Sequence, residues 1–335
     1  MQSRTVARPG EADAAVLAFT ASDLGVPSSL ARDSDAVARE PVPALAVSID
    51  CNGRRVAADP YWGTVEAVLE CAANLACVGA HALGATDNLN FGNPTKPHIA
   101  WQLTESVRGL GDACRALGVP IVGGNVSLYN EGPAGPIYPT PVVGMVGHLP
   151  DARRAARIGF SQAREAVALV GGFAPRLGAS ELHKLLGEPL PERLAAVDLD
   201  AARATQSAVR EAVRSGSLAS AHDIAEGGLA VALAECCLGG ALGASIALPA
   251  GHASGEHAVE DERGGLAELF GEAAGGFVVS GDERSLLALG ERVPVLHLGS
   301  VGGESLTIDR RGERLIDLPL ARLREAHDAL RELFP

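Results

Sequence analysis

Lysine is nearly absent from this chain of 335 residues, since only Lys96 and Lys184 occur. The 28 basic residues are outnumbered by 41 acidic ones, and the formal net charge is −13. Nucleic acids and anionic membranes are bound by clustered lysines and arginines, so this balance argues against both. We therefore expect a small-molecule partner. If that molecule carries phosphates that need a lysine clamp, this chain has almost no lysine to offer, and we expect the lysine on another chain.

Several other features are missing. The six cysteines show no C-x-x-C pair and no zinc spacing, so we expect reduced thiols. No apolar run approaches the roughly 18 residues of a membrane span, and residues 1–10 lack the apolar core of a signal peptide. These absences predict a cytoplasmic protein. The chain also has no G-x-S-x-G elbow, no P-loop and no recognisable cysteine nucleophile, which argues against a self-contained glutaminase.

The chain is long enough for two domains, and its apolar patterning alternates between strand and helix. We predict an N-terminal segment at 1–43 with a loop insertion from about residue 20, a domain at 44–150 and a second domain at 151–335. The expected strands are 44–49, 120–122, 139–149, 166–171, 218–221, 244–248, 276–280 and 293–299. The expected helices are 63–78, 98–117, 180–186, 200–214, 225–238, 285–289 and 318–333. This alternation indicates an α/β fold.

Two polar segments of the first domain, residues 85–94 and 123–131, are predicted to be active-site loops. Each follows a short apolar run and concentrates carboxylate, amide and hydroxyl side chains among glycines. Oxygen ligands suit Mg²⁺, and glycines allow backbone N–H groups to approach phosphate oxygens. Asn, Gly and Pro are also ordinary turn residues, so either segment alone could be plain loop structure. The pair together indicates a metal-nucleotide site.

A third polar segment, residues 222–228, is placed between a short strand and a helix. Asp223 could be the N-cap of that helix, with Glu226 as its capping-box partner. The same helix N-terminus could instead bind an anion or Mg²⁺. His222 could act as a general base or be a hydrogen-bonded structural residue. Residues 251–257 read as a surface loop, whose two histidines, His252 and His257, are treated as incidental.

Six segments, in this order and spacing, resemble phosphoribosylformylglycinamidine synthase. The similarity is to the second half of its large synthetase subunit and runs from about Pro9 to the C-terminus. The segments are 50–52, 59–63, 87–94, 123–131, 138–147 and 222–229. Several long motifs in register are more specific than any single loop.

The resemblance implies an α/β (α+β two-layer) fold, with a small sheet domain like that of aminoimidazole ribonucleotide synthetase followed by a larger α/β domain. It implies a ligase of purine biosynthesis that uses ATP, Mg²⁺ and glutamine-derived ammonia to convert formylglycinamide ribonucleotide into the amidine. The implied partners are a first-half synthetase chain, a glutaminase subunit and a small bridging subunit. Alternatives are a catalytically incomplete half or regulatory binding module, or another ATP-using superfamily member working as a homodimer.

The resemblance also assigns roles to individual residues. Asp87 and Gly124 match ATP-contacting positions, Asn125 a Mg²⁺ ligand and Ser127 a substrate contact, with His222 and Asp223 as weaker candidates. The family's catalytic histidine and phosphate-clamping lysine lie in the first half, so no catalytic residue is assigned here. One departure is Gly276, which stands where the family pattern has an arginine.

Overall fold

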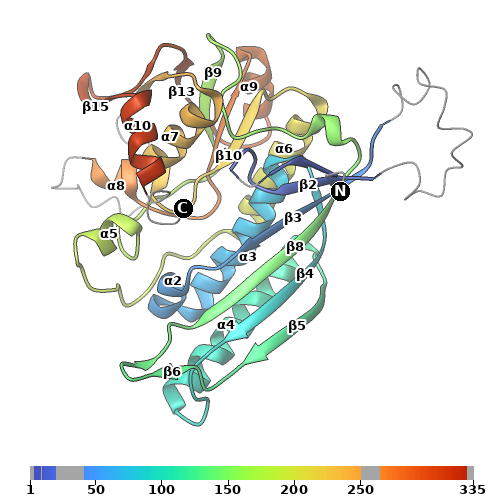
Figure 1. The fold of residues 1–335 in the computed structure, drawn as a ribbon, viewed down its shortest axis with the longest axis vertical. Coiled ribbons are helices and arrows are strands. Elements are labelled where there is room, and N and C mark those ends of the chain that lie inside the picture. The colour runs from blue at the N-terminus through green and yellow to red at the C-terminus, as the bar shows by residue number, and fades with distance from the viewer. Residues whose placement is uncertain (1–3, 9, 20–40, 250–264, 330–335) are drawn as a thin grey trace, which may run out of the picture.

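A computed structural model describes residues 4–8, 10–19, 41–249 and 265–329, and its elements form two sheets with their helices (Figure 1). The predicted α/β fold is confirmed. The predicted insertion from residue 20 and the loop at 251–257 fall outside the described residues, apart from residues 41–43. The division at residue 150 stays a prediction. Within the described residues, no helix has the length and apolar character needed to cross a lipid bilayer.

The first sheet has six strands in the order β1-β2-β3-β8-β4-β5. Neighbours are antiparallel, except that β4 and β5 run parallel. A short hairpin, β6 with β7, follows β5. The bounds are β1 Thr5–Ala7, β2 Ala15–Ala18, β3 Ala44–Asp50, β4 His81–Asn90, β5 Ile121–Ser127, β6 Glu131–Gly132, β7 Gly135–Pro136 and β8 Thr140–Leu149. Strands β1, β2, β4, β6 and β7 were not predicted from the sequence.

Three helices belong to this sheet: α2 (Gly53–Ala58), α3 (Pro60–Cys77) and α4 (Pro97–Leu117). Helix α3 begins with Asp59, which accepts a hydrogen bond from the Trp62 N–H, and with a proline at its first position. It packs against β3 and β8 on one side and against α4 and α6 on others, so it is buried on most of its surface. The helices cover one face of the sheet, and the opposite face carries exposed apolar side chains.

The second sheet has seven strands in the order β10-β12-β9-β13-β11-β14-β15, and only β11 and β14 pair in parallel. Its strands are β9 Ala166–Val170, β10 Ser220–Asp223, β11 Ala244–Leu248, β12 Phe277–Gly281, β13 Val295–Val301, β14 Ser305–Arg310 and β15 Glu313–Pro319. The remaining helices are η1 Ala152–Arg154, α5 Glu181–Leu185, α6 Leu199–Ser215, α7 Gly228–Gly240, α8 Leu266–Phe270, α9 Glu283–Gly290 and α10 Leu320–Asp328.

The long predicted helices and most predicted strands are confirmed to within a few residues. Two strands near the C-terminus were missed. Strand β14 was missed although its alternation of polar and apolar residues indicates a half-buried strand, and β15 has no buried residue because it forms the edge of the sheet. Part of the predicted helix at 318–333 is therefore strand β15, and α10 begins at Leu320. Helix α7 begins at Gly228, three residues later than predicted, because β10 continues through Asp223.

Candidate functional site

Residues 85–90 and 123–127 of the two predicted active-site loops lie instead in neighbouring strands, which corrects the sequence interpretation for these parts. Asp87 belongs to β4, and Gly124, Asn125 and Ser127 belong to β5. The parallel register sets Asp87 opposite Gly124 and Asn88 opposite Asn125. Tertiary pairing overrides the turn propensity of these Asn and Gly residues, because β5 completes the edge of the sheet. The two segments are adjacent, as the predicted site requires.

Gly124 allows the carboxylate of Asp87 to lie against the backbone of β5. A Cβ atom at position 124 would be 2.7 Å from Asp87 Oδ2, which is closer than real Cβ contacts. Burial raises the pKa of Asp87, although the residue is only partly buried. The edge strand β5 is exposed from Ile121 to Val126, so a ligand can reach Asp87 and Gly124 from solvent.

Asn125 is held by its neighbour on β4. Its Nδ2 donates a 2.9 Å hydrogen bond to Oδ1 of Asn88, and its own Oδ1 accepts no hydrogen bond from any described residue. Successive residues of a strand point to opposite faces, so Asn125 and Asn88 share the open face of the sheet whereas Asp87 points to the helix side. A single ligand would therefore contact Asp87 and Asn125 only across the exposed edge of β5.

Ser127 lies at the end of β5, beside a tight turn. Asn130 donates from Nδ2 to the Ser127 carbonyl at 2.9 Å and to the Phe91 carbonyl at 3.2 Å, which fixes the turn after the strand. Asn93 is also part of a turn, because its Oδ1 accepts hydrogen bonds from the backbone N–H and the hydroxyl of Thr95. Of the four carried-over residues, Ser127 is the only one that is tied into this local network.

The weaker candidates, His222 and Asp223, are in β10 and not at a helix N-terminus. The capping-box interpretation is wrong, because Gly227 is the N-cap of α7 and makes no side-chain cap bond. The Gly227 N–H instead donates to Oε1 of Glu272 at 2.9 Å, so a carboxylate from the chain itself already occupies the anion position.

His222 bridges two carboxylates. Its Nδ1 lies 2.7 Å from Asp13 Oδ1 and its Nε2 lies 3.0 Å from Glu235 Oε2. Burial alone would lower the pKa of His222, but the charge of Asp13 and the hydrogen bonds to both carboxylates raise it well above its usual value. Ligand atoms of Asp13, His222 and Asp223 lie within 4.8 Å of one another. The arrangement accounts for His222 as an ion-paired structural residue that joins residue 13 to the second sheet.

A second acidic group, Asp50, Glu70 and Glu226, lies at the junction of the two sheets, with ligand atoms within 4.8 Å of one another. These residues and Asp223 line a cavity of about 40 Å³, which has room for an ion or a water but not for a nucleotide. Burial, followed by the charge of Glu226, raises the pKa of Asp50 to about 6. Burial also raises the pKa of Glu70.

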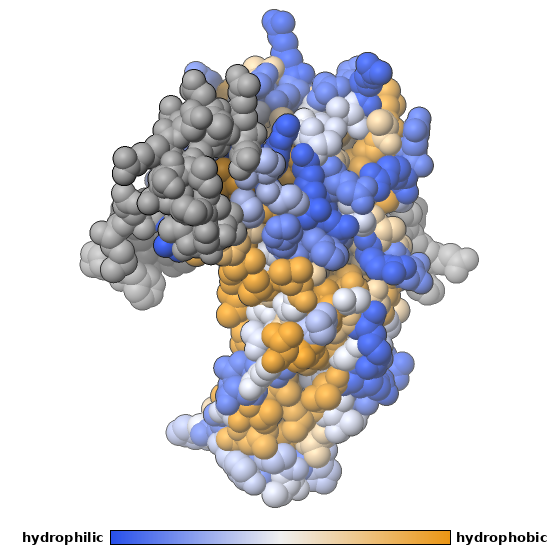
Figure 2. Space-filling view, turned by 90° about the vertical axis from the view of Figure 1, so that its right-hand side faces the viewer, coloured by the Kyte–Doolittle hydropathy of each residue, from blue (hydrophilic) through white to orange (hydrophobic). Residues whose placement is uncertain are grey.

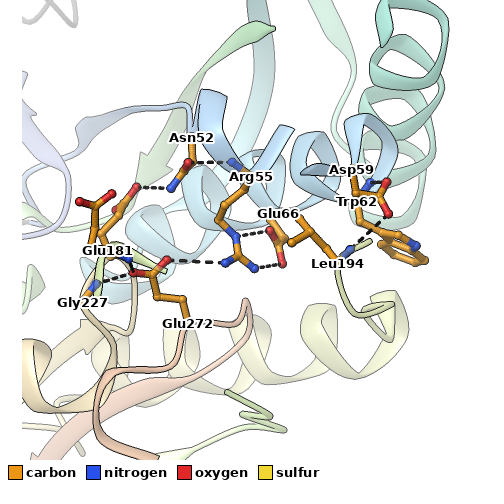
Figure 3. A network of polar contacts seen from close by, with 10 residues as sticks. Asn52, Arg55, Asp59, Trp62, Glu66, Glu181, Leu194, Gly227 and Glu272 are labelled. Carbon is orange, nitrogen blue, oxygen red and sulfur yellow. Dashed lines mark hydrogen bonds and ion pairs between the residues drawn. The ribbon is translucent and has the colours of Figure 1, made fainter. Parts of the chain in front are cut away.

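Arg55 connects this junction to the second sheet (Figure 3). Its Nε and Nη2 donate to both oxygens of Glu66 at 2.7 and 2.8 Å, and its Nη1 lies 3.6 Å from Glu272 Oε2. Nearby, Asn52 donates from Nδ2 to Glu226 at 3.1 Å. Glu272 in turn accepts hydrogen bonds from the Gly227 and Glu181 N–H groups. The network joins the helices of the first sheet to the loops of the second.

Sequence reasoning did not identify these buried charged groups as functional. A signal was available in α3, where Glu66 and Glu70 interrupt an otherwise apolar helix, and a carboxylate is rarely buried there without a partner. Two other buried charged groups have partners from distant segments, His222 with Asp13 and Arg55 with Glu272, so no local pattern could have paired them.

The two-sheet architecture and the paired polar strands define a class of proteins. Residues 13–149 match the N-terminal domain of the AIR synthase related proteins, and residues 166–304 match their C-terminal domain. The chain belongs to this family.

Within the family, the chain is similar to the phosphoribosylformylglycinamidine synthase subunit PurL. It is 42% identical to PurL of Synechococcus sp. (strain JA-3-3Ab) over 98% of this chain and 42% of the relative. Identity to PurL of Anaeromyxobacter sp. (strain Fw109-5) is 44%, over 84% of this chain and 37% of the relative. The chain therefore spans less than half the length of these relatives. The resemblance inferred from the sequence motifs is confirmed.

Solved structures of Thermotoga maritima PurL share the fold. The complex with FGAR superposes with a TM-score of 0.69 at 19% identity, covering 84% of this chain and 46% of that chain. The complex with ATP gives 0.66 at 18% identity, covering 84% and 44%. The PurLQS assembly gives 0.65 at 17% identity, again covering 84% and 44%.

Proposed function

We propose that this chain supplies the second half of a phosphoribosylformylglycinamidine synthetase, which converts formylglycinamide ribonucleotide to the amidine with ATP and glutamine-derived ammonia. The observation that carries the proposal is the 42% identity to PurL over 98% of the chain, across both sheets. In the implied reaction, ATP phosphorylates the amide oxygen of the ribonucleotide and ammonia then displaces the phosphate. Positioning of the phosphates supplies most of the catalysis in such a step.

The residues at the edge of β5 fit the assigned roles. The free Oδ1 of Asn125 is an oxygen ligand of the kind that Mg²⁺ prefers, and the bond from its Nδ2 to Asn88 orients it. Gly124 is exposed on the edge strand, so a phosphate could approach its backbone, and the carboxylate of Asp87 lies directly beside it. Ser127, two residues after Asn125 on the same strand, would contact the ribonucleotide. A bound Mg²⁺ would neutralise charge on the transferring phosphate.

The open face of the six-stranded sheet supports a partner. It carries exposed apolar side chains on β3, β4 and β8, among which Ile49 is 72% and Leu83 is 52% exposed. Figure 2 shows apolar surface gathered over this part of the molecule. Because Asn125 lies on the same face, a sheet docked there would lie beside the candidate metal ligand. We propose a first-half synthetase segment as that sheet, on the same or another polypeptide, with glutaminase and bridging subunits completing the complex.

The test is reconstitution. The chain is purified alone and with a first-half synthetase segment, and amidine formation is measured with saturating ammonia, Mg-ATP and formylglycinamide ribonucleotide. We expect no turnover by the chain alone and turnover by the mixture, because the family's catalytic histidine lies in the first half. Turnover by the chain alone would contradict the assignment to one half. No turnover by the mixture would favour the alternative of a regulatory module.

A further inference from the structure

A large cavity is lined by residues of the second half of the chain together with Arg55 and Glu66 of the first half, and no residue of β4 or β5 lines it. Its volume is about 600 Å³, within the range of roughly 300–1,000 Å³ that small-molecule sites occupy. The cavity lies where β9 ends at Val170 and α6 begins at Leu199.

Small side chains and backbone create the space. The walls come from the loop after β9, from the turn before β12 and from the first turns of α6. The wall residues with small side chains are Gly172, Ala174, Gly178, Ala195, Ala196, Ala201, Ala202, Ala273, Ala274 and Gly275. Pro191 and residues 193–198 also line the cavity, and this segment contacts the first domain where the Leu194 N–H donates to Asp59 Oδ2 at 3.4 Å. Figure 3 shows Leu194 beside Asp59, close to Arg55 and Glu66.

The charged groups that line the cavity differ in how far the chain itself already satisfies their hydrogen bonds. Three carboxylates line it, and all three already accept hydrogen bonds: Glu66 from Arg55, Glu272 from two backbone N–H groups, and Asp198 from the Ala201 N–H at the start of α6. These carboxylates are therefore satisfied by the chain itself and repel an anion less than free ones would.

Two of the lining arginines retain donors. Arg55 is 8% exposed, and its Nη1 lies 3.6 Å from Glu272 Oε2 but makes no hydrogen bond to the described residues. Arg193 is exposed, and its side chain makes no hydrogen bond or ion pair to the described part of the chain. A buried donor that lacks an acceptor costs free energy, and a ligand oxygen would remove that cost.

We infer that this cavity binds a small organic anion, a carboxylate or phosphate monoester no larger than a nucleoside monophosphate. Arg193 would contact its anionic group at the mouth, and the alanine-rich wall would accommodate its body. This site is additional to the proposed ATP site at the edge of β5.

The inference is tested by calorimetry and ligand-observed NMR on the full chain, with ribose 5-phosphate as the phosphate probe and citrate as the carboxylate probe. Arg193→Ala should weaken binding roughly tenfold, since it removes a charge-assisted contact. Ala201→Trp should abolish binding by filling the cavity, and thermal melting on the same samples would show that both variants fold. Asp87→Asn, at the proposed ATP site, should bind the probe as the native chain does.

Binding of neither probe at millimolar concentration would overturn the inference. Binding that persists unchanged in either Arg193→Ala or Ala201→Trp would overturn it as well, because the probe would then lie elsewhere. Loss of binding in Asp87→Asn would place the probe at the proposed ATP site and would also overturn it. None of these results bears on amidine synthesis, so the two proposals fail separately.

Discussion

The side-chain amide of Asn125 donates a 2.9 Å hydrogen bond to Oδ1 of Asn88, across the parallel pair β4 and β5. The bond engages Nδ2, and Oδ1 of Asn125 accepts no hydrogen bond from the described residues. A residue proposed as a metal ligand is therefore oriented by a neighbour that the sequence comparison did not single out. An orienting partner of this kind is usual for metal ligands.

The first prediction concerns the edge of β5. In the reconstituted complex, Asp87→Asn or Asn125→Ala should lower turnover by on the order of a hundredfold, because each removes a contact that positions the phosphate. Asn93→Ala is the matched control and should be milder, since Asn93 shapes a turn through Thr95. Turnover is measured together with thermal melting. If Asp87→Asn kept full turnover, or lost turnover only in proportion to its loss of folded protein, the catalytic interpretation of Asp87 would be wrong.

The second prediction concerns the apolar sheet face. Ile49→Lys should weaken association with a first-half segment by roughly tenfold or more, because a lone ammonium would be desolvated at the contact. The residue is exposed, so folding should be unaffected. Leu287→Lys is the control, since Leu287 is 74% exposed on α9, which belongs to the second sheet. Sedimentation velocity gives both affinities, and equal affinities would show that the partner binds elsewhere.

The third prediction concerns the buried ion pair of Arg55 and Glu66. Arg55→Met should lower the free energy of unfolding by about 3–5 kcal/mol, because it leaves a buried carboxylate without its partner. Arg203→Ala, which removes an exposed pair with Asp200 on α6, should cost less than about 1 kcal/mol. Urea denaturation measures both. A cost for Arg55→Met as small as that of the control would mean that the pair is not buried in solution.

The fourth prediction concerns pH. The pKa of Asp50 is raised to about 6 in the folded chain, above its ordinary value of 3.8. Its stabilising contribution is therefore fully present below about pH 4 and is lost as the pH rises through 6. Asp50→Asn should gain stability relative to the native chain over that interval, because the amide stays neutral. Urea midpoints measured from pH 4 to 8 test this, and a constant difference between the two proteins would contradict it.

Much of the fold followed from local patterns. The apolar periodicity of α3, α4 and α6 was readable because each helix buries apolar positions at helical spacing. Strand β9 was readable because it is buried throughout, and β3 and β8 because they bury every second residue. The family motifs identified the candidate residues at 87, 124, 125 and 127. Their identities and spacing are properties of the sequence itself.

Only the tertiary structure decided how those residues are arranged. Asn and Gly at 88 and 123–125 have turn propensity, and pairing with a neighbouring strand turned both segments into β-structure. The register then placed Asp87 and Asn125 on opposite faces, which spacing along the chain could not show. The pairing of Asp13 with His222 and of Arg55 with Glu272 joins segments about 200 residues apart. Such contacts depend on how the two sheets pack, because no local propensity links residues so distant in the chain.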